Sequence, residues 1–219
     1  MSLSIEKIAN AQVHIGTLKS EAHPKTNKYW LDVVQGMVVF NPEAIIKQLD
    51  TAKKRIQAAK KDWKNVLIAC EKKMYAEELE KLADQAGVTF LNYKIPAGFL
   101  TNFDTFQKRV ASMNQMIEYI GSDEFKSLTK KEQLIYKRKL SKIEKVYKGT
   151  KKVNTKPDLV VVIDGQRMSS FVDEIKKSHV DNIIIASSDF SRWRDEDSIV
   201  MANVGSYKSL DFVLRYILS

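Results

Sequence analysis

Short runs of apolar, mostly β-branched residues alternate with longer amphipathic segments in two blocks of this chain, and a different middle separates the blocks. The apolar runs predict buried strands at Met37–Phe40, Val66–Cys70, Val88–Leu91, Leu159–Ile163, Ile183–Ala186 and Ile199–Met201. The segments between them predict helices at Pro42–Lys60, Met74–Ala86, Met168–Ser178 and Ser206–Leu218. Such alternation is typical of parallel βαβ units, so we expect an α/β body with an open parallel sheet and helices on both faces.

The middle of the chain follows a heptad pattern instead. Apolar residues recur three or four positions apart, at Phe103, Phe106, Val110, Met113, Ile117 and Ile120. After the breaker Gly121, a capping box from Thr129 to Glu132 starts a second helix, whose apolar positions are Tyr136, Leu140, Ile143 and Tyr147. Two such helices predict an antiparallel coiled-coil hairpin, with two surface helices lying on the sheet as the alternative. We expect a globular body of residues 1–102 and 157–219 and an inserted basic hairpin of residues 103–156.

The positive charge of the chain is concentrated in this middle segment. The window 126–156 holds twelve of the 36 Lys and Arg residues and only two acids, Glu132 and Glu144. It carries +10 whereas the whole chain carries +9, so the remainder sums to −1. A dense cationic element favours a polyanion, because neutralised phosphates release counterions. We predict RNA contacts for the basic residues of the hairpin: Lys108, Arg109, Lys126, Lys130, Lys131, Lys137, Arg138, Lys139, Lys142, Lys145, Lys148, Lys151 and Lys152.

Several function classes are disfavoured by what the sequence lacks. No glycine-rich phosphate-binding motif follows a predicted strand, and Cys70 is the only cysteine, which excludes a disulfide framework and a thiolate zinc site. His14, His23 and His179 are isolated from one another and from Cys70, so no nucleophile and base can be paired. The sequence shows no signal peptide and no apolar run long enough for a membrane span. We expect a cytosolic or organelle-matrix protein with no metal, cofactor or small-molecule substrate.

Two carboxylates keep an enzymatic alternative open. Asp164 ends one predicted strand and Asp189 follows the next, where open α/β sheets place ligand-binding groups, so an RNA-directed enzyme could use them. Asp also forms turns and caps helices at strand ends, which is the structural interpretation of the same residues. A third hypothesis is a protein-interaction module whose apolar hairpin seam pairs with another helix.

The segment 92–102 connects the first block to the hairpin. Thr101 or Asn102 is predicted to cap the first hairpin helix, which would make the segment an elbow between strand and helix. As a functional element, the same segment presents Tyr93, Lys94 and Phe99 as a surface for base stacking and phosphate contact beside the base of the hairpin.

Eight short motifs follow one another in a consistent order along nearly the whole chain. They are His14-Ile15-Gly16; Pro24-Lys25; Glu71-Lys72-Lys73; Asn92 with Gly98 and Leu100-Thr101-Asn102; Phe103 to Arg109; Phe125 to Glu132; Lys137 to Glu144; and Pro157-Asp158-Leu159 to Asp164. Together they resemble the universal family of small-subunit ribosomal protein S-two in its bacterial and organellar form. The chain departs from the family at Lys94–Ala97, where the family has Arg-Trp-Leu-Gly, and at Ala202–Val204, where it has Pro-Gly-Asn.

The resemblance implies a flavodoxin-like α/β domain with an inserted antiparallel helical hairpin and no catalytic role. It further implies a structural constituent of the small ribosomal subunit near the junction of head and body, on a ribosome of the cytoplasm or of an organelle. The implied partners are ribosomal RNA, neighbouring ribosomal proteins and, in many bacteria, the large mRNA-binding protein S-one. The family motifs add Lys25, Lys72, Lys73, Thr101 and Asn102 to the expected RNA contacts.

Overall fold

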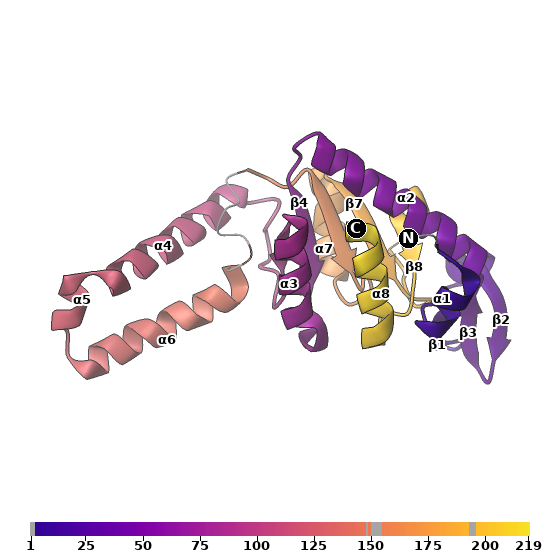
Figure 1. Ribbon diagram of the computed structural model, residues 1–219, viewed down its shortest axis with the longest axis horizontal. Helices are drawn as coiled ribbons and strands as arrows, with labels where there is room; N and C mark the ends of the chain where they lie inside the picture. The colour runs from indigo at the N-terminus through magenta and orange to yellow at the C-terminus, as the bar shows by residue number, and fades with distance from the viewer. Residues whose placement is uncertain (1–2, 148, 150–154, 193–195) are drawn as a thin grey trace.

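The computed structural model describes residues 3–147, 149, 155–192 and 196–219. Its body contains a five-stranded parallel sheet and a three-stranded antiparallel sheet, and a long helical pair projects from one side of that body (Figure 1). The arrangement confirms the predicted fold class. It also shows that the alternative, in which the two middle helices lie flat on the sheet, is wrong.

The parallel sheet contains strands β4 (Val66–Cys70), β5 (Thr89–Leu91), β6 (Leu159–Ile163), β7 (Asp181–Ala186) and β8 (Ile199–Met201). Their spatial order is β5-β4-β6-β7-β8, and every neighbouring pair is parallel. This is the flavodoxin order. The chain adds β5 on one side of β4 and then adds β6, β7 and β8 on the other side, so the topological switch point lies between β4 and β6. Side chains that follow these two strands therefore meet at one edge of the sheet.

Helices cover both faces of the parallel sheet. On one face lie α2 (Pro42–Lys61), α3 (Ala76–Ala86) and α8 (Tyr207–Leu218), and on the other lies α7 (Ser169–Ser178) (Figure 1). The predicted bounds of each of these helices are exact at one end and differ by one or two residues at the other. Gly87 ends α3 in the left-handed conformation expected of a glycine stop.

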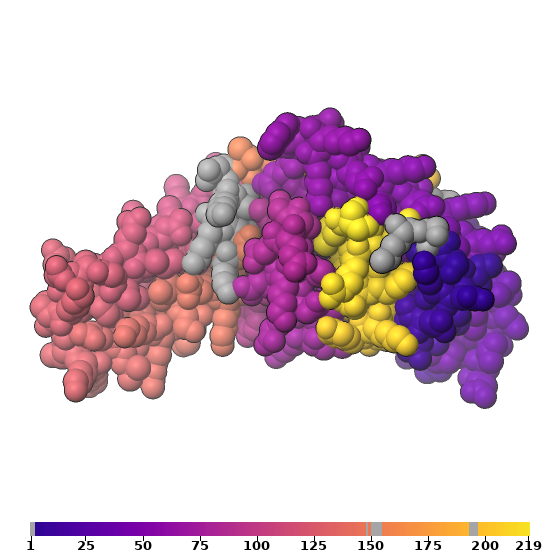
Figure 2. Space-filling model, viewed as in Figure 1, coloured from indigo at the N-terminus to yellow at the C-terminus, as the bar shows by residue number. Residues whose placement is uncertain are grey.

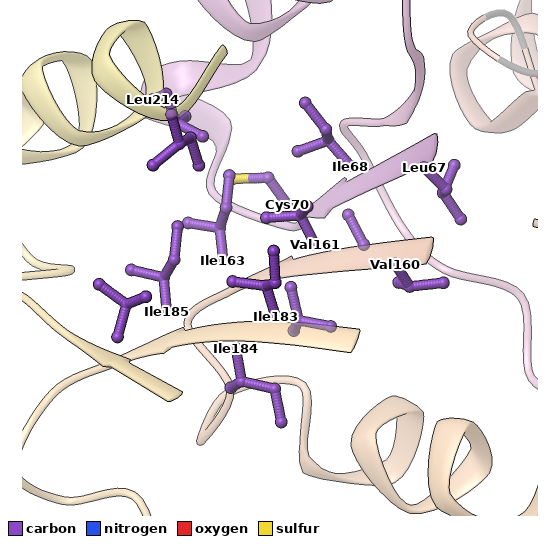
Figure 3. Packing of buried hydrophobic residues seen from close by; sticks show 14 of the residues in the cluster. Leu67, Ile68, Cys70, Val160, Val161, Ile163, Ile183, Ile184, Ile185 and Leu214 are labelled. Atoms are coloured by element: carbon purple, nitrogen blue, oxygen red, sulfur yellow. The ribbon is translucent and has the colours of Figure 1, made fainter. Parts of the chain in front are cut away.

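The core lies between these helices and the two central strands. Every residue of β4 and β6 is buried, as expected for strands covered on both faces. In Figure 3, Ile163 and Ile185 point toward α8, which contributes Leu214, whereas Ile184 points to the opposite side. Full burial of a side chain of this size stabilises the fold by about 1.5–3 kcal/mol.

The antiparallel sheet corrects one prediction. The strand β3 (Met37–Phe40) was expected in the parallel body, but it pairs antiparallel with β1 (Ile15–Leu18) and β2 (Trp30–Val34), which the sequence analysis did not identify. A tight turn joins β2 to β3, and both of its residues, Gln35 and Gly36, have positive φ angles. A turn with positive φ at both residues matches the twist of a two-stranded hairpin. The local turn geometry therefore favours antiparallel pairing of β2 with β3 over a place for β3 in the parallel sheet.

The N-terminal part also holds the short helix α1 (Ile5–Asn10) and a 3-10 turn, Pro24–Tyr29. Further 3-10 turns lie at Lys73–Tyr75 and Glu196–Ser198. Among the described residues, no helix is both long enough and apolar enough to cross a membrane.

The helical pair consists of α4 (Phe103–Gly121) and α6 (Lys130–Tyr147), joined by the short helix α5 (Asp123–Ser127). Near the body, the rings of Phe106 and Tyr147 lie 5.3 Å apart, and at the far end those of Tyr119 and Tyr136 lie 5.7 Å apart. Contacts between opposite ends of the two segments require antiparallel helices, which confirms the predicted hairpin. The helix α5 within the turn was not predicted.

Candidate nucleic-acid interface

Ten of the predicted RNA-contacting residues lie on the helical pair with exposed side chains: Lys108, Arg109, Lys126, Lys130, Lys131, Lys137, Arg138, Lys139, Lys142 and Lys145. In the space-filling view, the pair forms an arm that extends away from the body (Figure 2). Three further predicted contacts, Lys148, Lys151 and Lys152, lie outside the described residues. The arm therefore offers a cationic surface that a polyanion can approach from several sides.

Four of these residues form one stripe along α6. Lys131, Arg138, Lys142 and Lys145 are separated by 7, 4 and 3 positions, which places them on a single face of a helix. The apolar residues of α6 that face α4 lie on the opposite side. We call these four residues the α6 basic stripe; it extends about 21 Å at 1.5 Å per residue.

The start of α6 is fixed by the predicted capping box. The Thr129 hydroxyl and N–H donate to Glu132 Oε2 at 2.7 and 3.0 Å, and the Glu132 N–H donates to the Thr129 hydroxyl at 3.4 Å. The hydrogen bonds from the Thr129 side chain and backbone lower the pKa of Glu132, so its carboxylate stays ionised. Gln133 adds a bond from Nε2 to the Leu128 carbonyl at 3.0 Å, which holds the turn before the stripe.

An aromatic cluster attaches the arm to the body. The ring of Phe99 lies 4.6 Å from that of Phe106 on α4 and 6.1 Å from that of Phe171 on α7. Phe99 is only 1% exposed, so its ring packs in the core and has no free face for a base. The predicted stacking role of Phe99 is therefore corrected to a packing role, whereas Tyr93 and Lys94 of the same segment are exposed.

Gly149 brings the chain close to the sheet after α6. A Cβ atom at this position would lie 2.2 Å from the Phe90 carbonyl oxygen and 2.6 Å from its ring. Only glycine allows this approach, which seats the second end of the arm against β5.

The Leu-Thr-Asn segment is held by one carboxylate of the body. Glu174 Oε1 on α7 accepts hydrogen bonds from the N–H groups of Leu100 and Thr101, at 2.6 and 2.9 Å, and from the Thr101 hydroxyl at 3.1 Å. Asn102 occupies the predicted capping position of α4, but its side-chain oxygen accepts from the Thr105 hydroxyl at 2.8 Å and from no backbone N–H of the helix. Glu174 carries no local sequence signal for this role, because its partners are far away in the chain.

Lys72 follows β4 at the topological switch point of the sheet, and its side chain forms an ion pair with another residue of the body. Its Nζ is 2.7 Å from Asp164 Oδ2, and the two side chains are 16% and 11% exposed. This ion pair holds the Lys72 ammonium within the protein, and the RNA contact of Lys72 stays a prediction. Lys73 and Lys25 remain exposed.

Asp164 and Asp189 line the same cleft at the carboxyl edge of the sheet, as their positions after the strands predict. The cleft has a volume of about 440 Å³, and Lys72 and Ser187 also line it. Burial raises the pKa of Asp189, and the charges of Asp164 and Glu21 raise it further. The described residues lining the cleft include neither a histidine nor a cysteine, and the part of the chain that the structure describes holds no cluster of three potential metal ligands.

Cys70 is a core residue at the end of β4. Its side chain is inaccessible to solvent, and burial raises the pKa of the thiol to about 11. The reactive thiolate is therefore scarce near neutral pH.

Nearly the whole chain is similar to one family of known proteins. The sequence model of one family, described as Ribosomal protein S2, matches residues 8–219. The Small ribosomal subunit protein uS2 of Coprothermobacter proteolyticus is 28% identical over 175 residues, which cover 80% of this chain and 65% of that protein. The protein of the same name from Petrotoga mobilis is 27% identical over 213 residues, which cover 97% of this chain and 73% of that protein. Thus the chain spans a little less than two thirds of one relative's length and somewhat more of the other's.

Proposed function

We propose that this chain, which belongs to the ribosomal protein S2 family, is a structural constituent of the small ribosomal subunit. In this proposal the arm neutralises phosphates of the small-subunit ribosomal RNA, while the α/β body docks on RNA and on neighbouring ribosomal proteins near the junction of head and body. The mRNA-binding protein S-one is a further partner in this proposal. The ribosome is that of a bacterial cytoplasm or of an organelle matrix.

One observation carries the proposal. The α6 basic stripe lies on an arm that projects from a nearly neutral body, with its charges turned away from the seam that holds the arm together. A protein whose charge served solubility alone would not need to concentrate +10 in one window of a chain with a total of +9. The placement supports a role in which a phosphate backbone lies along α6.

The function is one of binding. Membership of the family makes the chain a non-enzymatic protein, so the RNA-directed enzyme that we considered from the sequence is set aside. Asp164 is held by Lys72 and also accepts a hydrogen bond from the Arg167 N–H at 3.1 Å. These contacts favour a structural role for Asp164 at the turn after β6.

Salt dependence is the physical signature of this binding mode. If six to ten phosphates are neutralised, affinity falls by about 10³ to 10⁵ between roughly 50 and 200 mM salt. Burial of apolar surface, which would hold a protein-interaction module, is much less sensitive to salt. The slope of affinity against salt therefore separates the two hypotheses.

The first test replaces the α6 basic stripe with glutamine in the full-length chain, at Lys131, Arg138, Lys142 and Lys145. Binding to protein-free small-subunit ribosomal RNA is measured by filter retention over a salt series. We expect the salt slope to decrease by about three units, because each of the four lost phosphate contacts releases roughly 0.7–0.9 counterions. Sedimentation on a sucrose gradient then checks whether the variant still travels with small subunits.

A matched control removes four exposed lysines from the helices of the body, Lys47, Lys54, Lys81 and Lys177. It changes the net charge by the same amount, so a slope that decreases equally in both variants would contradict a special role of the arm. A stripe variant with an unchanged slope would overturn the proposal.

A further inference from the structure

Trp63 is an exposed tryptophan in an unfavourable backbone conformation. It follows the end of α2 with a φ angle of 55° in the left-handed region, and its side chain is 95% exposed. The Trp63 N–H donates to the Lys60 carbonyl at 3.2 Å, and the Lys64 N–H donates to the Ala59 carbonyl at 2.9 Å. This pair of hydrogen bonds is the Schellman motif, in which the left-handed position usually holds glycine.

The same motif also ends α3 and α1, where the residue in the left-handed position is less bulky than Trp63. At the end of α3, the left-handed position is Gly87, and at the end of α1 it is Gln12, a small-to-medium polar residue at an exposed site. A bulky side chain in this conformation is strained. With 95% of its surface in solvent, Trp63 gains almost no burial that would offset the strain. The folded chain by itself therefore gives no reason for tryptophan at this position.

The surroundings of Trp63 are cationic. Lys60, Lys61 and Lys64 flank it, with Asp62 as the only acid among the five residues 60–64. The Lys64 ammonium lies 3.4 Å from the Asp62 carboxylate, and both side chains are more than half exposed. A large aromatic face with lysines on either side is the combination that binds a nucleotide, because the ring stacks on the base while the ammonium groups approach the phosphates.

The position also adjoins the root of the arm. Asn65, two residues after Trp63, donates from its N–H to the Asp158 carboxylate at 2.8 Å and from its side chain to the Thr155 carbonyl at 3.3 Å. Both partners belong to the segment by which the chain returns from the hairpin to β6. In Figure 1, α2 accordingly ends on the side of the body from which the arm projects.

Between this loop and the returning segment lies a cleft of about 520 Å³, which Lys64 and Lys156 both line. Lys156 is itself exposed. Asp158 and Asp181 also line this cleft, and Asp181 is paired with Arg55, so Lys64 and Lys156 supply the cationic groups between the returning segment and the loop that carries Trp63.

We infer that Trp63 is a stacking platform for an unpaired base of the same RNA whose phosphates bind the arm. The inference rests on the proposed function. It adds a second RNA contact, which lies on the body, tolerates different bases and is separate from the phosphate contacts of the arm. An unpaired base is required, because the faces of paired bases are covered by their neighbours in the helix.

The test separates folding from binding, because the two are expected to change in opposite directions. Replacing Trp63→Gly removes the strain, so the melting temperature should rise by about 2–4 °C for a chain of this size. The same variant should bind protein-free small-subunit ribosomal RNA about 5- to 150-fold more weakly, which is the range for loss of one stacked base. Trp63→Phe should keep most of the affinity, since it retains an aromatic face.

Gln12→Gly is the matched control, since it changes the same motif at the end of α1. It should stabilise the chain to a similar extent and leave RNA affinity unchanged. In a direct assay, a 12-nucleotide oligoadenylate should quench the tryptophan emission of the full-length protein more than it quenches that of Trp63→Gly, and a blunt RNA duplex of the same length should not.

Each contrary result has a distinct meaning. If Trp63→Gly binds RNA with full affinity while the stripe variant does not, the inference is overturned and the proposed function stands. If Trp63→Gly binds protein-free RNA normally but is lost from small subunits on a sucrose gradient, Trp63 docks on a protein and the inference is again overturned. If the unchanged protein fails to bind the RNA at all, the proposed function fails and the inference fails with it.

Discussion

The body and the arm of this protein are stabilised in different ways. In the body, every residue of β4 and β6 is buried, and helices cover both faces of the sheet. In the arm, α4 buries Phe106, Val110 and Met113, whereas Tyr147 is the one buried residue within α6. A region that must present charge on most of its surface keeps only a narrow apolar seam, so the arm depends on a few buried side chains of α4, whereas the body depends on a continuous core.

The largest losses of stability should come from a cavity made in either region. The two cavities should destabilise different parts of the chain. Ile163→Ala in β6 and Met113→Ala in α4 each remove a side chain with no solvent exposure, which typically costs about 2–5 kcal/mol. We expect Ile163→Ala to lower the free energy of unfolding of the whole chain, whereas Met113→Ala should loosen the arm and leave the sheet intact. Urea denaturation measures the first effect, and amide hydrogen exchange of α4 and α6 measures the second.

Cys70 provides a readout for the body alone. Its buried thiol has a pKa raised to about 11, so modification by a thiol reagent near neutral pH requires opening of the core. Ile163→Ala should increase the labelling rate strongly and Met113→Ala should not. If Cys70 labelling were accelerated equally in both variants, arm and body would open together. The claim that the two regions are stabilised separately would then be wrong.

A smaller effect should follow from loss of the capping box at the start of α6. Thr129→Ala removes the hydroxyl that bonds Glu132 and should speed amide exchange in the first turn of α6 by about 2- to 30-fold, the range for loss of an N-cap. Ser122→Ala is the matched control, since its hydroxyl accepts from the Phe125 N–H at the start of α5. An effect of Thr129→Ala on Cys70 labelling would contradict the independence of the body.

The smallest effect should be a pH dependence that belongs to the body. Because burial raises the pKa of Asp189, the protonated carboxyl is favoured in the folded state, and stability is lost as the pH rises through the raised pKa. Asp189→Asn should therefore stabilise the chain modestly at neutral pH and change little below the ordinary pKa of 3.8. Thermal melts of both proteins across this pH range test the expectation, and a variant that is less stable at neutral pH would contradict it.

The sequence predicted the body best where burial is complete. The bounds of β4 and β6 were predicted without error, because strands covered on both faces appear as uninterrupted apolar runs. The strands β1 and β2 were missed, because both lie in the smaller sheet, where most of their residues are not buried, and neither has such a run.

The site was predictable where it is local and unpredictable where it depends on distant partners. The heptad spacing and the capping box placed the charges of α6 on an antiparallel hairpin without any tertiary information. In contrast, the pairing of Lys72 with Asp164 and the packing of Phe99 against Phe171 join residues far apart in sequence. A composition signal does exist for Trp63, a tryptophan among lysines just after a helix, but its strained backbone and its exposure are visible only in three dimensions.

The arm is inserted between β5 and β6, and this position affects the order in which the sheet can be completed. During synthesis, β4 and β5 are made before the arm, and β6, which occupies the centre of the sheet, is made after it. The arm has mainly local contacts and can form early, and in doing so it brings Phe106 and Tyr147 together. The loop that must close before β6 can pair with β4 becomes shorter, and its entropic cost falls. The arm, which projects outward in the folded protein, would thus also hold the two ends of the insertion together during folding and help β6 to pair with β4.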